Sequence, residues 1–337
     1  MSKSSPKYIG IDVSKSDLAI ALPVVVPSTP LTKLQSKKKN PQWEHCVLKN
    51  ETVAIESWLS KQDLKNSHFI LEATGTYSSK VIAVLTRLDA VFSVLNPRQS
   101  KAWAVATGHK NKTDRQDAQI LSDFGAKNQP KPYKPISPEA QKRQQAVTAL
   151  RAFKKQLQAI RNQIHALEQL PEPDPVILKG YEIIVETLQK QIQAFQELIQ
   201  PTPDEPQLQK VVQLIVSIPC IGKDTAHKIT ALLGDLSQFK SAKALAAFIG
   251  VSPCIRQSGT SLDKATTSTQ GIPEIKLALY NCARSAIQHN PICKKFYRNL
   301  VDHKFKKKMV ALVAVMHKLV RMIWGIVHSE VPFKIAV

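Results

Sequence analysis

Proline-rich stretches divide this chain and limit what it can fold into. The stretch QPKPYKPISPE, residues 129–139, contains four prolines, and PTPDEP ends at residue 206. Proline has no backbone N–H and its ring clashes with the preceding helical turn, so neither a long helix nor a central strand passes through such a stretch. The sequence therefore predicts three segments: a domain over residues 1–130, a linker with a helical arm over 131–206, and a domain over 207–337.

The first segment alternates apolar strands with helices. Its patterns predict three successive strands, in KYIGIDVS, SDLAIALP and HCVLK, and then a helix in ETVAIESWLSK. Strands follow in HFILEAT and AVFSVLN, with helices over residues 77–88 and from Pro97 and Thr113. Three strands followed by alternating helices and strands is the order found in α/β domains of the ribonuclease-H (RuvC-like) type. Residues 23–43, rich in Pro and Lys, are predicted to form a loop inserted between the second and third strands.

The middle segment carries a heptad pattern that suits a helical coiled coil. Apolar residues recur at alternating spacings of three and four, namely Leu150, Phe153, Leu157, Ile160, Ile164 and Leu167. PEPDP interrupts the pattern, and a second helix follows with a less regular seam: Ile177, Tyr181, Ile184, Leu188, Phe195 and Leu198, with Gln191 on the seam. An intramolecular hairpin and a dimer-forming arm both fit, and the arm is the favoured interpretation.

The third segment is predicted to be mostly helical. LIVSIPCIGKDTAHKITALLG resembles a helix-hairpin-helix, whose second helix begins near Lys223 and offers backbone N–H groups to a phosphate; an ordinary helical turn is the alternative. Ser241 is predicted to cap a helix that Gly250 ends. The apolar run MVALVAVMHKLVRMIWGIV contains His317, Lys318 and Arg321 at helical spacing. It therefore predicts an amphipathic, mostly buried helix and no membrane span.

The net charge indicates a polyanionic partner. Lys and Arg number 47 against 26 Asp and Glu, which gives a formal charge of +21. Neutralisation of phosphates is the usual use of such an excess, which favours nucleic acid over a membrane surface. The N-terminus MSKSSPKY lacks the apolar core of a signal peptide, and the five cysteines form no CxxC pair. A reducing cytoplasm without a structural zinc site is therefore expected.

Four carboxylates stand out in this basic chain. In HKNKTDRQDAQIL, Asp114 and Asp117 are three residues apart and would share one face of a helix, although Thr113 as N-cap with acids in the first turn explains them as well. Asp12 interrupts the apolar strand IGIDVSK, and Glu72 ends the strand of HFILEATGTY. An acid in an apolar strand is costly to bury unless it is paired or binds a metal.

Together these carboxylates predict a magnesium site. Mg²⁺ prefers oxygen ligands, and two such ions about 4 Å apart would contact the attacking and leaving oxygens of a phosphodiester. The predicted metal ligands and catalytic acids are Asp12, Glu72, Asp114 and Asp117. The neighbouring basic residues are predicted to hold the nucleic-acid backbone: His109, Lys110, Lys112 and Arg115.

These motifs, with NPRQSKAWAVATGHKNKTDRQDAQIL, resemble the DEDD transposases of the IS110 family. SIPCIGKDTAHKITALLGDLSQFKSAKALAAFIGVSP is similar to the C-terminal domain of that family, so the resemblance covers most of the chain. Two departures are visible. Cys220 stands where the family usually has Gly in the hairpin turn, and the loop over residues 23–43 is longer than usual.

The resemblance implies a transposase that cuts and rejoins DNA through a serine nucleophile and a phosphoseryl-DNA intermediate. Ser258, in QSG, matches the family position best, with Ser252 and Ser261 as local competitors and Arg256 as a nearby candidate phosphate contact. It further implies that acids and serine meet between protomers of a dimer, with a tetramer in the synaptic complex. Donor and target DNA and a structured non-coding guide RNA would be the partners, in a prokaryotic cytoplasm at the nucleoid.

Two other functions fit part of the sequence. A nuclease of the same fold would use the four acids with water as nucleophile and would not need Ser258. A non-catalytic nucleic-acid-binding protein would use the basic surface and the helix-hairpin-helix. The presence of all four acids disfavours the binding protein, and the C-terminal domain disfavours the plain nuclease.

Overall fold

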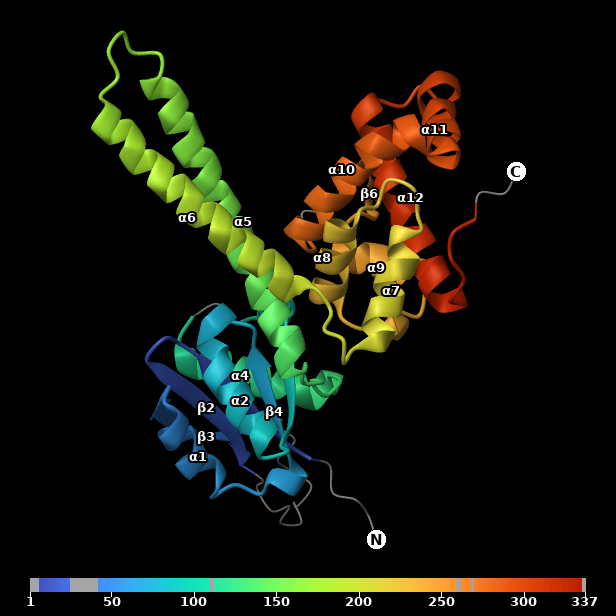
Figure 1. Cartoon of the computed structure of the whole chain (residues 1–337). Coiled ribbons are helices and arrows are strands. Elements are labelled where there is room, and N and C mark those ends of the chain that lie inside the picture. Colours follow the sequence, from blue (N-terminus) through green and yellow to red (C-terminus); the bar gives the residue numbers. More distant parts are fainter. Residues whose placement is uncertain (1–5, 25–41, 110–111, 259–261, 268–269, 335–337) are drawn as a thin grey trace, which may run out of the picture. The chain divides into compact units, whose positions relative to one another are not determined.

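The computed structural model describes residues 6–24, 42–109, 112–258, 262–267 and 270–334. The chain forms two compact units, Met1–Pro135 and Ile136–Val337 (Figure 1). The first unit is a mixed α/β structure and the second is mostly helical, as the sequence predicts at this level.

A five-stranded sheet forms the centre of the first unit, in the order β3-β2-β1-β4-β5. β1 pairs antiparallel with β2 and parallel with β4, while β2–β3 is antiparallel and β4–β5 parallel. The strands are β1 (Lys7–Val13), β2 (Asp17–Val24), β3 (Gln42–Lys49), β4 (Ser67–Glu72) and β5 (Val91–Leu95). Each predicted strand is present.

Helices cover the sheet because its strands are apolar on both faces. They are α1 (Thr52–Leu59), α2 (Ser79–Arg87), α3 (Pro97–Ala106) and α4 (Asp114–Asn128), with 3-10 turns at Leu64–Asn66 and Gly75–Ser78. Ile9 and Ile11 of β1 pack in the core formed with α1 and α2. Alternation of side chains then directs Gly10 and Asp12 to the other face, on which α4 packs.

Gly10 lets α4 lie unusually close to β1. A Cβ atom at this position would lie 1.9 Å from the carbonyl oxygen of Ala118 and 2.7 Å from the backbone nitrogen of Ser122. Ser122 also donates a 2.8 Å hydrogen bond through its hydroxyl to the carbonyl of Tyr8 on the same strand. The first turn of α4 is thereby held at the level of Asp12.

A long helical hairpin begins the second unit. α5 (Pro138–Leu167) and α6 (Pro175–Ile199) run side by side within the chain (Figure 1). Phe153 and Phe195 meet edge to face, with ring centroids 5.1 Å apart. The predicted seam on α5 is the least exposed stripe of its outer half, as a helix pair requires.

The predicted seam on α6 is partly wrong. Ile177, Ile184 and Leu198 are exposed. The stripe that is buried or half-buried has a regular three-and-four spacing: Leu178, Tyr181, Val185, Leu188, Ile192, Phe195 and Ile199. Both faces of α6 are apolar, so the sequence pattern alone did not decide which one packs on α5. The exposed apolar face is left over for another contact.

The rest of the second unit surrounds one core. Its helices are α7 (Pro206–Val216), α8 (Lys223–Leu233), α9 (Ala242–Ile249), α10 (Pro273–His289), α11 (Pro291–Arg298) and α12 (Lys308–Ser329), with a 3-10 turn at Leu236–Gln238 and a π turn at Asn299–His303. The sequence missed a two-stranded hairpin, β6 (Pro253–Ser258) and β7 (Leu262–Thr267). Ser241 caps α9 and Gly250 ends it with φ 85°, as predicted.

By length and composition, α12 is the one described helix that is long and apolar enough to cross a membrane. A core helix passes the same test. Leu312, Val315, Leu319 and Ile323 of α12 are buried in the core that α7 to α11 share. The helix packs one face in this core, although it is less buried than the mostly buried helix that the sequence predicts.

Candidate functional site

Two of the predicted acids lie at neighbouring strand ends. Parallel pairing sets Ile11 of β1 opposite Leu71 of β4, so Asp12 and Glu72 follow at the same level of the sheet. Carboxyl ends of parallel strands form the edge at which ligands commonly bind in α/β folds. Both carboxylates are half-buried.

The other two acids occupy the first turn of α4. Thr113 caps this helix, since its hydroxyl accepts a 3.3 Å hydrogen bond from the backbone N–H of Gln116. Asp114 is exposed and Asp117 is half-buried. Asp114 and Asp117 are therefore first-turn acids of a helix that Thr113 caps, as the alternative explanation held. They can also belong to a metal site, because the same helical turn faces Asp12.

The four acids act on one another electrostatically. The pKa of Asp12 is raised to about 6, first by burial and then by the charges of Asp117, Asp114 and Glu72. Burial also raises the pKa of Asp117; the nearby Lys112 opposes this, while Glu72 and Asp114 add to it. Asp12 and Asp117 therefore lie within electrostatic reach of the other acids.

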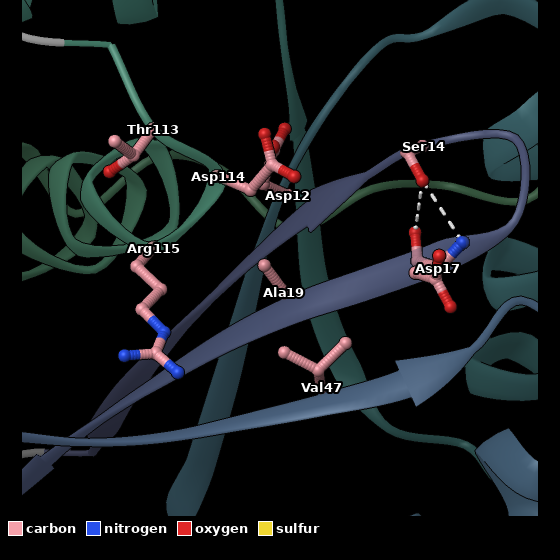
Figure 2. A pocket seen from close by; sticks show the side chains of 8 residues that line it. All are labelled: Asp12, Ser14, Asp17, Ala19, Val47, Thr113, Asp114 and Arg115. Atoms are coloured by element: carbon pink, nitrogen blue, oxygen red, sulfur yellow. Dashed lines mark hydrogen bonds between the residues drawn. The ribbon is translucent and has the colours of Figure 1, made fainter.

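A pocket of about 290 Å³ opens at this edge of the sheet (Figure 2). Figure 2 shows the carboxylates of Asp12 and Asp114 next to each other on one side, while Arg115 extends from α4 away from them. On the other side, the hydroxyl of Ser14 donates to the carbonyl of Asp17 at 2.9 Å and accepts from its N–H at 3.0 Å. The tight turn between β1 and β2 is fixed by these bonds.

Glu72 is further oriented by a residue that the sequence did not single out. The hydroxyl of Ser100, which is 5 % exposed, donates a 2.5 Å hydrogen bond to Oε2 of Glu72. Ser100 also donates to the carbonyl of Pro97, so its own position is set by α3. Nothing in the spacing of NPRQSK signals this role, because it depends on how α3 returns over β4.

The carboxylate oxygens of the four acids are suitable ligands for Mg²⁺, although they are not arranged as a closed coordination site. All four groups are carboxylates, the hard oxygen ligands that this ion prefers. In the described part of the chain, no three or more His, Cys, Asp or Glu side chains are arranged closely enough to hold a metal ion. The prediction of a two-ion site thus stays a prediction.

The predicted basic residues surround the acids only in part. His109, Lys112 and Arg115 are exposed close to the start of α4, and Arg115 lines the pocket. Lys110 lies outside the described residues. Exposed cations beside an acidic pocket are what a phosphate backbone approaching a metal site requires.

The second unit carries the remaining predicted residues. Lys223 is the first residue of α8, directly after the turn that begins with Cys220. Cys220 has φ 79°, a left-handed conformation that glycine adopts at less cost, so the departure at this position falls on a strained residue.

The candidate nucleophile stands at the end of the unpredicted hairpin. Ser258 is the last residue of β6, paired with Leu262, and Arg256 is paired with Lys264. The side chains of both lie outside what the structure describes, as does the competitor Ser261. A short run of turn residues between two strand-like runs was the signal available in CIRQSGTSLDKATT.

Two family profiles match the chain. One, described as "Transposase" and named for the DEDD proteins of IS110, covers residues 9–170, including all four acids. The other, described as "Transposase IS116/IS110/IS902 family", covers residues 212–298, including Cys220 and Ser258. The chain belongs to the IS110 family of transposases. It is therefore an enzyme of DNA recombination, and DNA is its substrate.

Two relatives of this IS110 transposase align with it over nearly their whole length, and a third over about a third. The pilin gene-inverting proteins of Moraxella bovis and Moraxella lacunata are each 28 % identical over 338 aligned positions, which cover 98 % of both chains. The transposase for insertion sequence element IS1111A of Coxiella burnetii is 29 % identical over 126 residues, 36 % of this chain and 34 % of that protein.

Proposed function

We propose that this transposase cuts and rejoins DNA through Ser258, with magnesium held by Asp12, Glu72, Asp114 and Asp117. The observation that carries the proposal is that Asp12 and Asp114 line one pocket at the edge of the sheet and that the charges of Asp117, Asp114 and Glu72 all act on Asp12. The strand order β3-β2-β1-β4-β5, with three antiparallel strands followed by two parallel ones, supports a ribonuclease-H-like (RuvC-like) fold for the unit.

The proposed reaction conserves the phosphodiester bond energy. The hydroxyl oxygen of Ser258 attacks phosphorus and gives its proton to water; an O–P bond forms, and the bond to the leaving deoxyribose oxygen breaks as that oxygen takes a proton. The reverse attack, by the hydroxyl of another strand, rejoins DNA and releases the serine. Bound Mg²⁺ would supply charge stabilisation at the phosphoryl oxygens. Ser100 would keep Glu72 oriented while the metal binds.

Basic residues are proposed to hold nucleic-acid backbones on both units. His109, Lys110, Lys112 and Arg115 would do so beside the acids, and Lys223 and Arg256 on the second unit. Cations of this kind bind phosphates without reading sequence. A structured guide RNA that pairs with donor and target DNA would supply the sequence reading, and the formal charge of +21 suits two nucleic-acid partners.

The active assembly is proposed to be a homo-oligomer, a dimer that becomes a tetramer when donor and target meet. The exposed apolar residues of α6 support the dimer-forming arm, because Val176 is 80 % and Ile183 59 % exposed, and Ile177, Ile184 and Leu198 follow the same helix. The acids of one protomer would then complete the site of the serine of its partner. The setting would be the prokaryotic cytoplasm, at the nucleoid.

Covalent trapping tests the proposal. Purified protein, its associated RNA and end-labelled donor and target DNA are incubated with Mg²⁺, and protein–DNA adducts are resolved under denaturing conditions. An adduct is expected for the wild type and for Ser261→Ala, and none for Ser258→Ala or Asp117→Ala. DNA cleavage that persists in Ser258→Ala without an adduct would establish water as the nucleophile and overturn the serine mechanism.

A further inference from the structure

A cavity lined entirely by residues of the second unit is formed mainly by α9 and α12. It has a volume of about 940 Å³ and is enclosed by the start of α9, the segment that leads into β6, one residue of α11 and one face of α12. A cavity of this size accommodates a small-molecule ligand or a few nucleotide groups. Neither the acids nor the helix-hairpin-helix turn contributes to it.

Its floor is apolar and aromatic. Phe296, Val313, Ala314 and Trp324 line it. Trp324 is held in place, because its indole N–H donates a 2.9 Å hydrogen bond to the carbonyl of Phe239 and its ring stacks on His328 with centroids 4.0 Å apart. Fixed rings of this kind offer a planar surface on which a nucleobase can stack with little loss of side-chain freedom.

Its rim is positively charged. The exposed residues Lys243 and Arg321 line the opening, and no Asp or Glu is among the described residues around it. Lys318 lies just behind, with its Nζ 4.7 Å from the ring centroid of Phe296. An apolar floor below a cationic rim suits a ligand that is flat and apolar at one end and anionic at the other.

One polar group inside lacks a partner within the described chain. The hydroxyl oxygen of Ser252 is buried, lines the cavity and makes no hydrogen bond to any described residue. A buried hydroxyl without a partner costs free energy, which a ligand with a donor or acceptor at this point would recover. Ser252 is also next to Pro253, where β6 begins, and β6 ends at Ser258.

We propose that this cavity receives an unpaired base of the DNA strand being cut, with the adjoining phosphates on Lys243 and Arg321. DNA is the ligand of this family that combines an apolar base with an anionic backbone, and the same strand continues along β6. Bases next to a strand break must leave their old partners before they join new ones, and a stacking site keeps them ordered in between. The identity of the cut strand rests on the proposed role of Ser258; the binding of unpaired bases does not.

Photo-crosslinking tests the cavity without needing catalysis. The probe is a 12-nucleotide single strand of thymidines with one central 5-iodo-deoxyuridine, added to the full-length Ser258→Ala protein. Crosslinks are expected on Phe296, His317 or Trp324 and are identified by peptide mass spectrometry. The same oligonucleotide annealed to its complement should give far fewer, because stacked bases cannot enter.

A filled cavity provides the matched comparison. Ala314→Trp places an indole in the cavity, whereas Ala247→Trp adds the same group at an exposed position of α9 that does not line it. We expect Ala314→Trp to abolish the crosslinks and weaken binding of the single strand about tenfold, the worth of one stacked base, and Ala247→Trp to change neither. Val310→Asp, at the exposed rim, should weaken binding similarly without any change in the core.

Several outcomes would overturn the inference. Crosslinks that map elsewhere, or equal binding by all variants, would show that bases do not enter. Reduced dimer or tetramer mass in Ala314→Trp and Val310→Asp, at unchanged DNA binding, would show that a second copy of the chain covers the cavity. A wild-type protein that forms no covalent adduct in the trapping experiment, with crosslinks retained, would reject only the serine mechanism. The assignment of the cavity would be unchanged.

Discussion

The two units place their candidate functional side chains by different physical means. In the first unit the acids lie inside regular elements, β1, β4 and α4, whose pairing register and close packing fix them. In the second unit the notable residues stand where elements end: Cys220 in a left-handed turn and Ser258 as the last residue of β6. The acidic site should therefore be sensitive to packing behind it, and the second unit to backbone conformation and single polar contacts.

The largest effect is expected at Gly10, where a substitution tests whether close packing positions the acids of the first unit. We expect Gly10→Ala to destabilise the first unit by about 3 kcal/mol or more and to abolish recombination, because its Cβ would collide with the backbone of α4. Denaturant unfolding followed by the fluorescence of Trp43, Trp58 and Trp103 measures the loss. Gly180→Ala on α6, where an added Cβ would meet nothing within 4 Å beyond the helix's own backbone, is the control; calorimetric unfolding of the second unit should show it stabilised by about 0.5–1 kcal/mol. Equal effects at both positions would contradict the packing argument.

A largely buried ion pair joins α5 to the residue before α7 in the second unit. Arg143, 6 % exposed, donates two hydrogen bonds of 2.7 and 2.8 Å to the carboxylate of Glu205, which also accepts from the N–H and hydroxyl of Thr202. Arg143→Ala is expected to destabilise the unit by about 2 kcal/mol at neutral pH. Calorimetric unfolding measures it, with Arg151→Ala, whose pair with Glu274 is more exposed, as the milder control.

This pair also predicts a pH dependence. Burial would raise the pKa of Glu205, but its hydrogen bonds from Arg143 and Thr202 and the charge of Arg143 bring the net pKa below the usual value. A carboxyl whose folded pKa is lowered stabilises the fold above its unfolded pKa, and this contribution is lost as the pH falls through the folded one. The wild type should therefore lose stability below about pH 4.5 more steeply than Arg143→Ala. Parallel curves for the two proteins would reject the pair as the cause.

A substitution at Ser100 tests whether the orientation of Glu72, separately from packing, matters for the acidic site. Ser100→Ala removes the hydrogen bond to Glu72, and we expect about a tenfold to hundredfold loss of Mg²⁺ affinity or strand cleavage with little change in stability. Magnesium titration of cleavage measures the shift, and Ser100→Thr, which keeps the hydroxyl, should recover part of it. Unchanged magnesium dependence would mean that Glu72 needs no second contact.

The smallest effect is expected at Cys220. Cys220→Gly should stabilise the second unit by about 0.5–1 kcal/mol, because glycine adopts φ 79° without the steric cost that Cβ imposes, less the extra entropy of its unfolded chain. Thermal unfolding of this variant beside Cys220→Ala, which keeps the Cβ and should be near neutral, gives the test. A stabilised alanine variant would attribute the effect to the thiol instead.

Sequence reasoning succeeded wherever a pattern had one physical solution. The apolar strands of the first unit, the Thr113 and Ser241 caps and the break at the proline-rich linker each follow from local chemistry, and each is present. Sequence reasoning failed where a helix has two equally apolar faces, either of which could pack. The second helix of the arm has apolar residues on two faces, and only contact with α5 selects the stripe through Val185 and Ile192 over that through Ile184.

By itself, the sequence determined the family and the order of the elements in the first unit, and it singled out the four acids as candidates, because strand periodicity, proline breaks and carboxylates in apolar surroundings are local properties. Tertiary structure alone decided that Asp12 and Glu72 lie side by side at the edge of the sheet and that α4 packs closely against Gly10. It also decided that Ser100 donates a hydrogen bond to Glu72. It also created the cavity beside β6, whose walls come from residues about 80 positions apart in the chain. Local sequence sets which conformations a segment prefers, whereas distances between segments depend on the packing of all of them together.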